Sequence, residues 1–148
     1  QLGSISTGTL RVQDLLEAFL PYVEPDADDA GEAKGVLARI ANNDWPVGVA
    51  NFEEYCAEFD TAELLQSIID QMNCPPFIYF GAHAGDGADF GFWVDVEAIG
   101  EAIRYETESD ESVSGDHVLP NENVIIQIND HGNATCYDME RNVIWSCV

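Results

Sequence analysis

The residues best suited to chemistry are imidazole and carboxylate side chains in two turn-like segments. They are His83, Asp86, Asp89, Asp130 and His131. If these groups converged, they could hold a divalent metal ion or act as general acid and base. Their spacing lacks the defining residues of an EF-hand or a P-loop, and glycine with aspartate is also the usual composition of a tight turn. We therefore expect a plain hairpin without a metal or cofactor, and a metal-dependent enzyme or sensor is the alternative.

Nucleophilic catalysis has little support in the sequence. There are three histidines, no G-x-S-x-G motif, and four cysteines without a C-x-x-C pair. Cys136 and Cys147 fall on expected strands, and a buried thiol is usually inert. Cysteines without paired ligands in a chain of this length are typical of reduced thiols, so we expect a cytoplasmic protein without disulfides or zinc. We predict that the protein is not an enzyme.

The most unusual property of the sequence is its charge. Among 148 residues there are 28 aspartates and glutamates but only five lysines and arginines, which gives a net charge of −23 and a pI near 4.1. Non-specific binding to DNA, RNA or an anionic membrane needs positive charge, so the sequence excludes these partners. No apolar run approaches the ~18 residues of a membrane-spanning segment. The charge favours a strongly basic protein as partner.

Two groups of carboxylates in the amino-terminal half are the strongest candidates for partner contacts. One group lies in a predicted loop, and the other lies on consecutive predicted helices. The candidates are Glu24, Asp26, Asp28, Asp29, Glu53, Glu54, Glu58, Asp60 and Glu63. Carboxylates spaced like phosphates would be attracted to a basic groove that normally holds a nucleic acid. The leading hypothesis is an inhibitor or binding protein that mimics nucleic acid, with a host defence nuclease or DNA-binding protein as target.

The acidity is also compatible with a toxin-binding role or with a salt-rich environment. The same electrostatics would suit an immunity-type protein that neutralises a cationic toxin. A high-salt cytoplasm also favours acidic surfaces with few lysines, and Lys34 is the single lysine of the chain. Solubility alone needs much less charge than −23. Neighbouring genes would separate an inhibitor from an immunity protein, and folding in dilute buffer would argue against salt adaptation.

Hydrophobic periodicity predicts four helices in the amino-terminal half. The first apolar stripe runs from Val12 to Leu20 and stops at Pro21. Each of the other three stripes follows a polar residue with capping-box spacing. These pairs are Asp29 with Glu32, Asn51 with Glu54, and Asp60 with Glu63.

Strand-like patterns take over after Pro76. Segments 77–81 and 90–94 are aromatic and β-like on either side of the glycine-rich loop 81–89, and Asp95 is placed to cap a short helix. Residues 106–116 are polar and are expected to form a mobile loop. A three-strand meander is predicted at Val124–Ile128, Ala134–Tyr137 and Val143–Cys147.

Together these elements predict a single α+β domain. Residues 9–74 would form its helical part and residues 75–148 a mainly β part. The amino-terminal helices are expected to pack on one face of a carboxy-terminal antiparallel sheet of about five strands. Residues 1–8 are expected to be a vector-derived, disordered extension, because the chain lacks an initial methionine.

Two stretches of the sequence resemble known groups of proteins. The segments 79–93 (YFGAHAGDGADFGFW) and 129–135 (NDHGNAT) are similar to parts of small uncharacterised proteins of phages and other bacterial mobile elements. Ile78-Tyr79 followed by the segment 91–95 (GFWVD) resembles acidic antirestriction proteins of plasmids. These resemblances imply an anti-defence role and carry over no catalytic residue.

Overall fold

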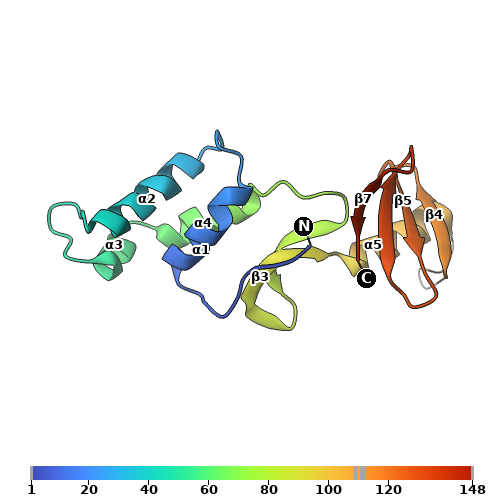
Figure 1. The fold of residues 1–148 in the computed structure, drawn as a ribbon, viewed down its shortest axis with the longest axis horizontal. Coiled ribbons are helices and arrows are strands. Elements are labelled where there is room, and N and C mark those ends of the chain that lie inside the picture. The colour runs from blue at the N-terminus through green and yellow to red at the C-terminus, as the bar shows by residue number, and fades with distance from the viewer. Residues whose placement is uncertain (1, 109, 111–112, 148) are drawn as a thin grey trace. The chain divides into compact units, whose positions relative to one another are not determined.

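The chain divides into two compact units. The computed structural model describes residues 2–108, 110 and 113–147. One group of contacts joins Ser4–Asn73 with Phe80–Gly91, and we call it the helical unit. The other joins Cys74–Tyr79 with Phe92–Val148 and the first three residues, and we call it the sheet unit. Each unit is described by itself (Figure 1).

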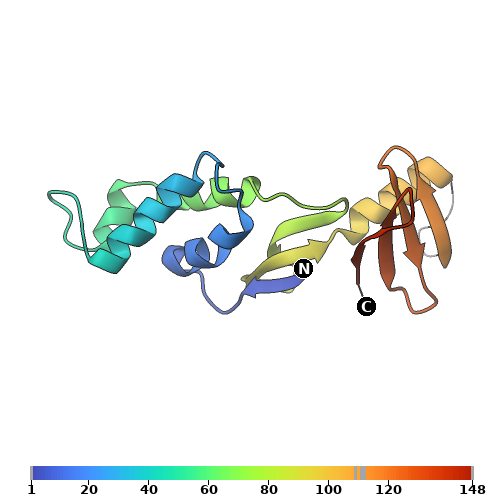
Figure 2. The ribbon, with the colours of Figure 1, turned by 45° about the horizontal axis from the view of Figure 1, so that its top comes forward.

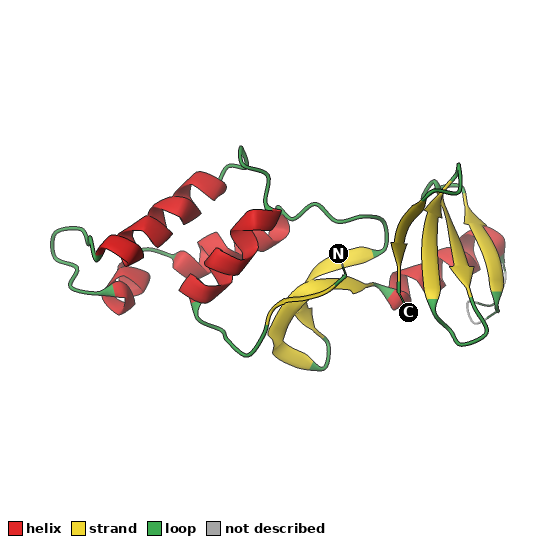
Figure 3. Cartoon of the chain, in the orientation of Figure 1, coloured by secondary structure: helices red, strands yellow, loops and turns green. Residues whose placement is uncertain are grey.

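Four α-helices build most of the helical unit. They are α1 (Val12–Phe19), α2 (Ala30–Asn42), α3 (Phe52–Glu58) and α4 (Thr61–Asp70), with a 3-10 turn at Leu20–Tyr22 after α1. Helix α1 contacts both α2 and α4, and Figure 3 shows these helices as neighbours. Its apolar stripe is buried at Leu15, Leu16 and Phe19, as the periodicity predicts.

The helix starts follow the expected caps, with one exception. The side chains of Asn51 and Asp60 accept the backbone N–H groups three residues ahead, which satisfies donors that the first helical turn leaves free. Asp95 does the same for the helix that it precedes. Asp29 precedes α2 but makes no side-chain cap. Its carboxylate is bound elsewhere, so the capping box expected at Asp29 is wrong.

The glycine-rich segment is mostly strand. Strands β2 (Ile78–His83) and β3 (Asp86–Val94) form a hairpin with a two-residue turn at Ala84-Gly85, and β1 (Gly3–Ser6) pairs with the other edge of β3. Aromatic rings join the hairpin to α1. Phe19 meets Phe80 edge-on, with ring centroids 4.9 Å apart, and lies 5.5 Å from Phe90.

The sheet unit is a four-stranded antiparallel sheet with one helix. Strands β4 (Gly115–Leu119), β5 (Val124–Ile128), β6 (Ala134–Asp138) and β7 (Val143–Ser146) follow each other in space as in sequence. Helix α5 (Val96–Thr107) contacts β4 and lies along one face of the sheet (Figure 2). It contributes the buried Ile99 and Ile103 to the core.

The strand register aligns a buried row across this sheet. His117 pairs with Ile126, Ile126 with Cys136, and Cys136 with Trp145. All four side chains are buried, and Ile126 and Cys136 are 0% exposed. Period-two alternation of burial is clear in β4, whereas in β5 the consecutive residues Val124, Ile125 and Ile126 are all buried.

The α+β class is confirmed, but the strand arrangement differs from the prediction. The strands form a three-stranded and a four-stranded sheet, so the expectation of a single sheet of about five strands is wrong. Strand β4 begins at Gly115 inside the expected polar loop, of which positions 109, 111 and 112 lie outside the described residues. The helix that contacts the four-stranded sheet is α5. Strand β1 also lies within the stretch expected to be disordered.

Candidate acidic partner-binding surface

All nine predicted contact residues belong to the helical unit. Eight of them are exposed and Asp29 is half-buried. The loop residues Glu24, Asp26 and Asp28 precede α2, while the other exposed five lie on α3, on α4 or between them. The structure thus places both predicted groups of carboxylates in one compact unit.

Three of the nine carboxylates also hold local structure. The Asp29 carboxylate accepts hydrogen bonds from the Ser67 hydroxyl and from the Gln71 side-chain amide (2.8 Å), which ties the start of α2 to α4. Asp60 accepts the Glu63 N–H at 2.9 Å, and Glu54 accepts the Ala50 N–H at 2.8 Å. These three side chains have a structural role whether or not a partner binds. The other six have no such bond among the described residues.

Two helix starts meet around an acidic hollow. It has a volume of about 390 Å³ and is lined by Asp29, Glu32, Phe59, Asp60, Glu63, Leu64 and Ser67. Three of its four carboxylates belong to the predicted set. Glu32 does not, because its spacing from Asp29 suggested a capping role. Asp29 makes no cap, and Glu32 lies in the wall of the hollow as its fourth carboxylate.

The nine predicted carboxylates are not neutralised by ion pairs among the described residues. Ion pairs form elsewhere, where Arg11 meets Asp14 at 3.8 Å and Arg141 meets Asp116 at 3.2 Å. The field of the nine carboxylates is therefore available to groups outside the chain.

Helix dipoles explain part of the acidity only. Acidic side chains stand in the first turns of α2, α3 and α4, where they stabilise the positive end of the helix dipole. The same effect would favour cations in the last turns. Helices α1, α3 and α4 have no basic residue there. Only α2 in the helical unit has a basic residue in its last turn, Arg39, so three of the four helices of this unit use only the acidic half of the dipole effect.

The candidate metal ligands are in two different turns. His83, Asp86 and Asp89 lie on the β2–β3 hairpin of the helical unit, and Asp130 and His131 lie between β5 and β6 in the sheet unit. The turns use polar side chains for their own backbone, since His83 Nδ1 accepts the Gly85 N–H at 3.0 Å and Asp86 accepts the Ala88 N–H at 3.0 Å. Across the described residues no group of three or more His, Cys, Asp or Glu side chains is placed to hold a metal ion. The tight-turn interpretation thus has support at His83 and Asp86, whose side chains bind the backbone of the hairpin.

The thiols differ in environment. All four cysteines are free, and Cys136 is buried while Cys147 is exposed. Burial raises the pKa of the Cys136 thiol to about 11. A thiol with so high a pKa is protonated at neutral pH and is a poor nucleophile.

The comparisons with known proteins give no relative. The chain matches no protein-family model, and no curated protein or solved structure is significantly similar to it. The likeness to mobile-element and antirestriction proteins therefore stays a prediction. None of the helices in the described ranges combines the length and apolarity that crossing a membrane requires.

Proposed function

We propose that this chain is an acidic binding protein that occupies the basic, nucleic-acid-binding groove of a partner protein. The observation that carries the proposal is the uncompensated acidity of the helical unit. This unit contains three basic and sixteen acidic side chains. Its exposed carboxylates in the predicted set lack internal ion-pair partners among the described residues. A basic groove evolved for phosphates offers the complementary field.

The contacts are expected to come from exposed carboxylates without a structural role. They are Glu24, Asp26, Asp28, Glu53, Glu58 and Glu63 of the predicted set, together with Glu32. Keeping so many like charges on a small fold costs stability through self-repulsion. A basic partner would offset this self-repulsion in the complex. Binding such a partner therefore explains the high charge better than solubility, which needs much less charge.

The test is a salt titration of binding to basic proteins. Purified DNA-binding nucleases and repressors with a basic groove are mixed with the protein, and the Kd is measured between 50 and 500 mM NaCl. We expect association to weaken at least tenfold over this range, because steering is screened beyond about 8 Å at physiological ionic strength. Binding that is unchanged in high salt, or an absence of binding across the panel, would contradict the proposal.

Two matched triple variants locate the contact surface. Glu53→Gln, Glu58→Gln and Glu63→Gln remove three exposed charges from α3 and α4. The control, made of Glu97→Gln, Asp130→Asn and Glu140→Gln, removes three exposed charges from the sheet unit. Exposed ion pairs contribute about 0.2–1 kcal/mol each, so the first variant should weaken binding by about tenfold and the control by much less. Equal losses of affinity in the two variants would show that binding depends on the total charge of the chain and not on these carboxylates of α3 and α4.

Folding of the protein in dilute buffer distinguishes this proposal from adaptation to high salt. A binding protein of an ordinary cytoplasm should be folded at 20 mM salt, and its circular dichroism should change little up to 2 M salt. A fold that forms only in molar salt would favour salt adaptation. Selective binding to a cationic toxin within the panel would favour the immunity-type function.

A further inference from the structure

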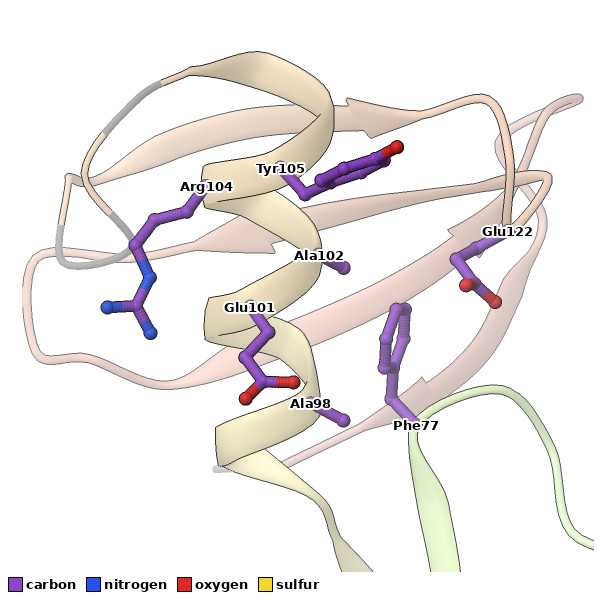
Figure 4. A pocket seen from close by; sticks show the side chains of 7 residues that line it. All are labelled: Phe77, Ala98, Glu101, Ala102, Arg104, Tyr105 and Glu122. Atoms are coloured by element: carbon purple, nitrogen blue, oxygen red, sulfur yellow. The ribbon is translucent and has the colours of Figure 1, made fainter.

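The sheet unit has a hollow between α5 and the segment that precedes β2. Its volume is about 700 Å³, and its lining residues are Phe77, Ala98, Glu101, Ala102, Arg104, Tyr105 and Glu122. Figure 4 shows the Phe77 and Tyr105 rings on the same side of α5, with Ala102 between them on the helix and Ala98 one turn further along it. We call it the aromatic hollow. Its lining residues belong to the sheet unit, whereas the nine predicted contact residues belong to the helical unit.

Phe77 has an unusual backbone conformation for its size. Its φ is 61°, in the left-handed region that bulky residues rarely adopt. Backbone groups fix this conformation on both sides: Ile78 N–H donates to the Pro75 carbonyl at 3.1 Å, and Asp95 N–H donates to the Phe77 carbonyl at 2.8 Å. Glycine would adopt the same turn without strain. The chain therefore has a half-buried aromatic ring where the backbone alone would favour glycine.

The opposite wall of the aromatic hollow is also aromatic and is more exposed. Tyr105 is 82% exposed, although it lies on a helix whose other face is packed. Its neighbours on the floor, Ala98 and Ala102, are too small to cover it. The Phe77 and Tyr105 rings thus flank an open space on the surface of the sheet unit.

Two carboxylates supply negative charge at this site. Glu101 is on α5, and the Glu122 carboxylate lies beside the Phe77 ring (Figure 4). The turn that presents Glu122 is anchored, because Asn121 N–H donates to the Glu106 carboxylate of α5 at 2.9 Å. Arg104 points to the other side of the helix, where its Nε donates to the Gly100 carbonyl at 3.4 Å. The hollow therefore combines aromatic faces and two carboxylates with one cation, Arg104, which also lines it but whose guanidinium lies away from the Phe77 and Tyr105 rings (Figure 4).

We propose that the aromatic hollow receives an arginine side chain of the basic partner. A guanidinium group stacks on aromatic rings and forms paired hydrogen bonds to a carboxylate, so it matches Phe77, Tyr105 and the two glutamates better than a lysine ammonium does. The openness of the hollow suits a side chain carried by a larger molecule. This assignment rests on the proposed function for the identity of that molecule, and its chemistry can be tested without it.

The test uses a small arginine probe and nuclear magnetic resonance. Nα-acetyl-arginine amide is titrated into the ¹⁵N-labelled full chain, with the neutral isostere Nα-acetyl-citrulline amide and the lysine analogue as controls. We expect saturable shifts in the millimolar range at amides near Phe77, Ala102 and Tyr105, weaker shifts with lysine, and none with citrulline. Shifts distributed evenly over the acidic residues of both units would overturn the assignment.

Three variants separate recognition from folding and from net charge. Phe77→Gly relieves the left-handed backbone yet removes a ring, and Tyr105→Ala removes the exposed ring, so both should fold and weaken arginine binding by about threefold to tenfold. Glu122→Gln should weaken it similarly, while Glu97→Gln on α5 changes the charge equally outside the hollow and should have little effect. Equal effects of the two glutamate variants would contradict the assignment.

The outcome also distinguishes failure of this assignment from failure of the proposed function. Arginine binding at the hollow without any salt-sensitive complex in the panel would retain the site and reject the nucleic-acid mimic. A salt-sensitive complex that is insensitive to Phe77→Gly and Tyr105→Ala would retain the mimic and reject the hollow as its anchor.

Discussion

A hydrogen bond from the Trp145 side chain to Pro76 helps to hold the segment that presents Phe77 to the aromatic hollow. Trp145 on β7 is 5% exposed, and its indole Nε1–H donates to the Pro76 carbonyl at 2.8 Å. Pro76 directly precedes Phe77. Replacing Trp145 by phenylalanine therefore removes both a donor and part of a buried ring at the base of the segment that presents the Phe77 side chain.

The size of the effect follows from these two losses. The lost hydrogen bond costs about 1 kcal/mol, because Pro76 is exposed and water can partly replace the indole donor. The missing part of the indole ring leaves a partly filled space in the core, which adds roughly 1–2 kcal/mol. The free energy of unfolding of the sheet unit should fall by about 2–3 kcal/mol.

Urea unfolding and amide hydrogen exchange measure this change. With an m value of about 1–3 kcal/mol/M, the midpoint for the sheet unit should fall by about 1 M. Exchange of the β5 and β6 amides reports that unit by itself. The control is Trp45→Phe in the helical unit, whose indole donates to Asn43 at an exposed position, and it should lose less than about 1 kcal/mol. Equal losses in the two variants would refute the role assigned to the Trp145 bond.

Further predictions concern a thiol, a cap and the acidic charge. Cys147 should react with a thiol reagent in the native state, while Cys136 should react only on unfolding. Burial in the folded state raises the Cys136 pKa from 9.0 to about 11, so the free energy of unfolding should fall by roughly 2–3 kcal/mol as the pH rises through this interval. Cys136→Ala should remove that fall. Asp60→Ala should cost the helical unit about 1 kcal/mol in thermal or urea unfolding, whereas Asp60→Asn should retain most of the cap; equal losses would contradict the cap. Unfolding midpoints should rise between 20 and 200 mM salt as self-repulsion is screened.

The helices could be predicted because their signals are local. Apolar stripes and the caps at Asn51 and Asp60 lie within a few residues of the helices that they define. The cap at Asp29 could not be excluded from the sequence, because Ser67 and Gln71, far along the chain, bind its carboxylate. Long-range hydrogen bonds of this kind override a local capping pattern.

The sheets were harder to predict, because strand pairing is not local. Strand β4 starts with Gly115 and Asp116, which are not typical strand residues, so the local sequence gives little sign of it. Its pairing with β5 shows that it is a strand. The glycines around His83 suggested a loop, yet hairpin pairing satisfies the backbone on both sides of the two-residue turn. The separation into two sheets depends on which strands pair, and periodicity carries no such information.

The candidate sites also differ in whether the local sequence could predict them. Composition was enough to predict exposed carboxylates, and eight of the nine are exposed, while their role in binding a partner stays a prediction. The aromatic hollow could not be predicted, since Phe77, Tyr105 and Glu122 come from a turn, a helix and a second turn. One signal was available: Tyr105 lies off the apolar stripe that Ile99 and Ile103 define on α5.

The most direct test of a nucleic-acid mimic is competition with nucleic acid itself. A partner identified in the salt titration is first saturated with fluorescently labelled duplex DNA or RNA at 100 mM salt, and the protein is then added while anisotropy is followed. If the acidic surface occupies the basic groove, the labelled nucleic acid is released in proportion to the protein bound, and a ternary complex does not form. Binding of the protein with the labelled nucleic acid still in place would contradict occupation of that groove.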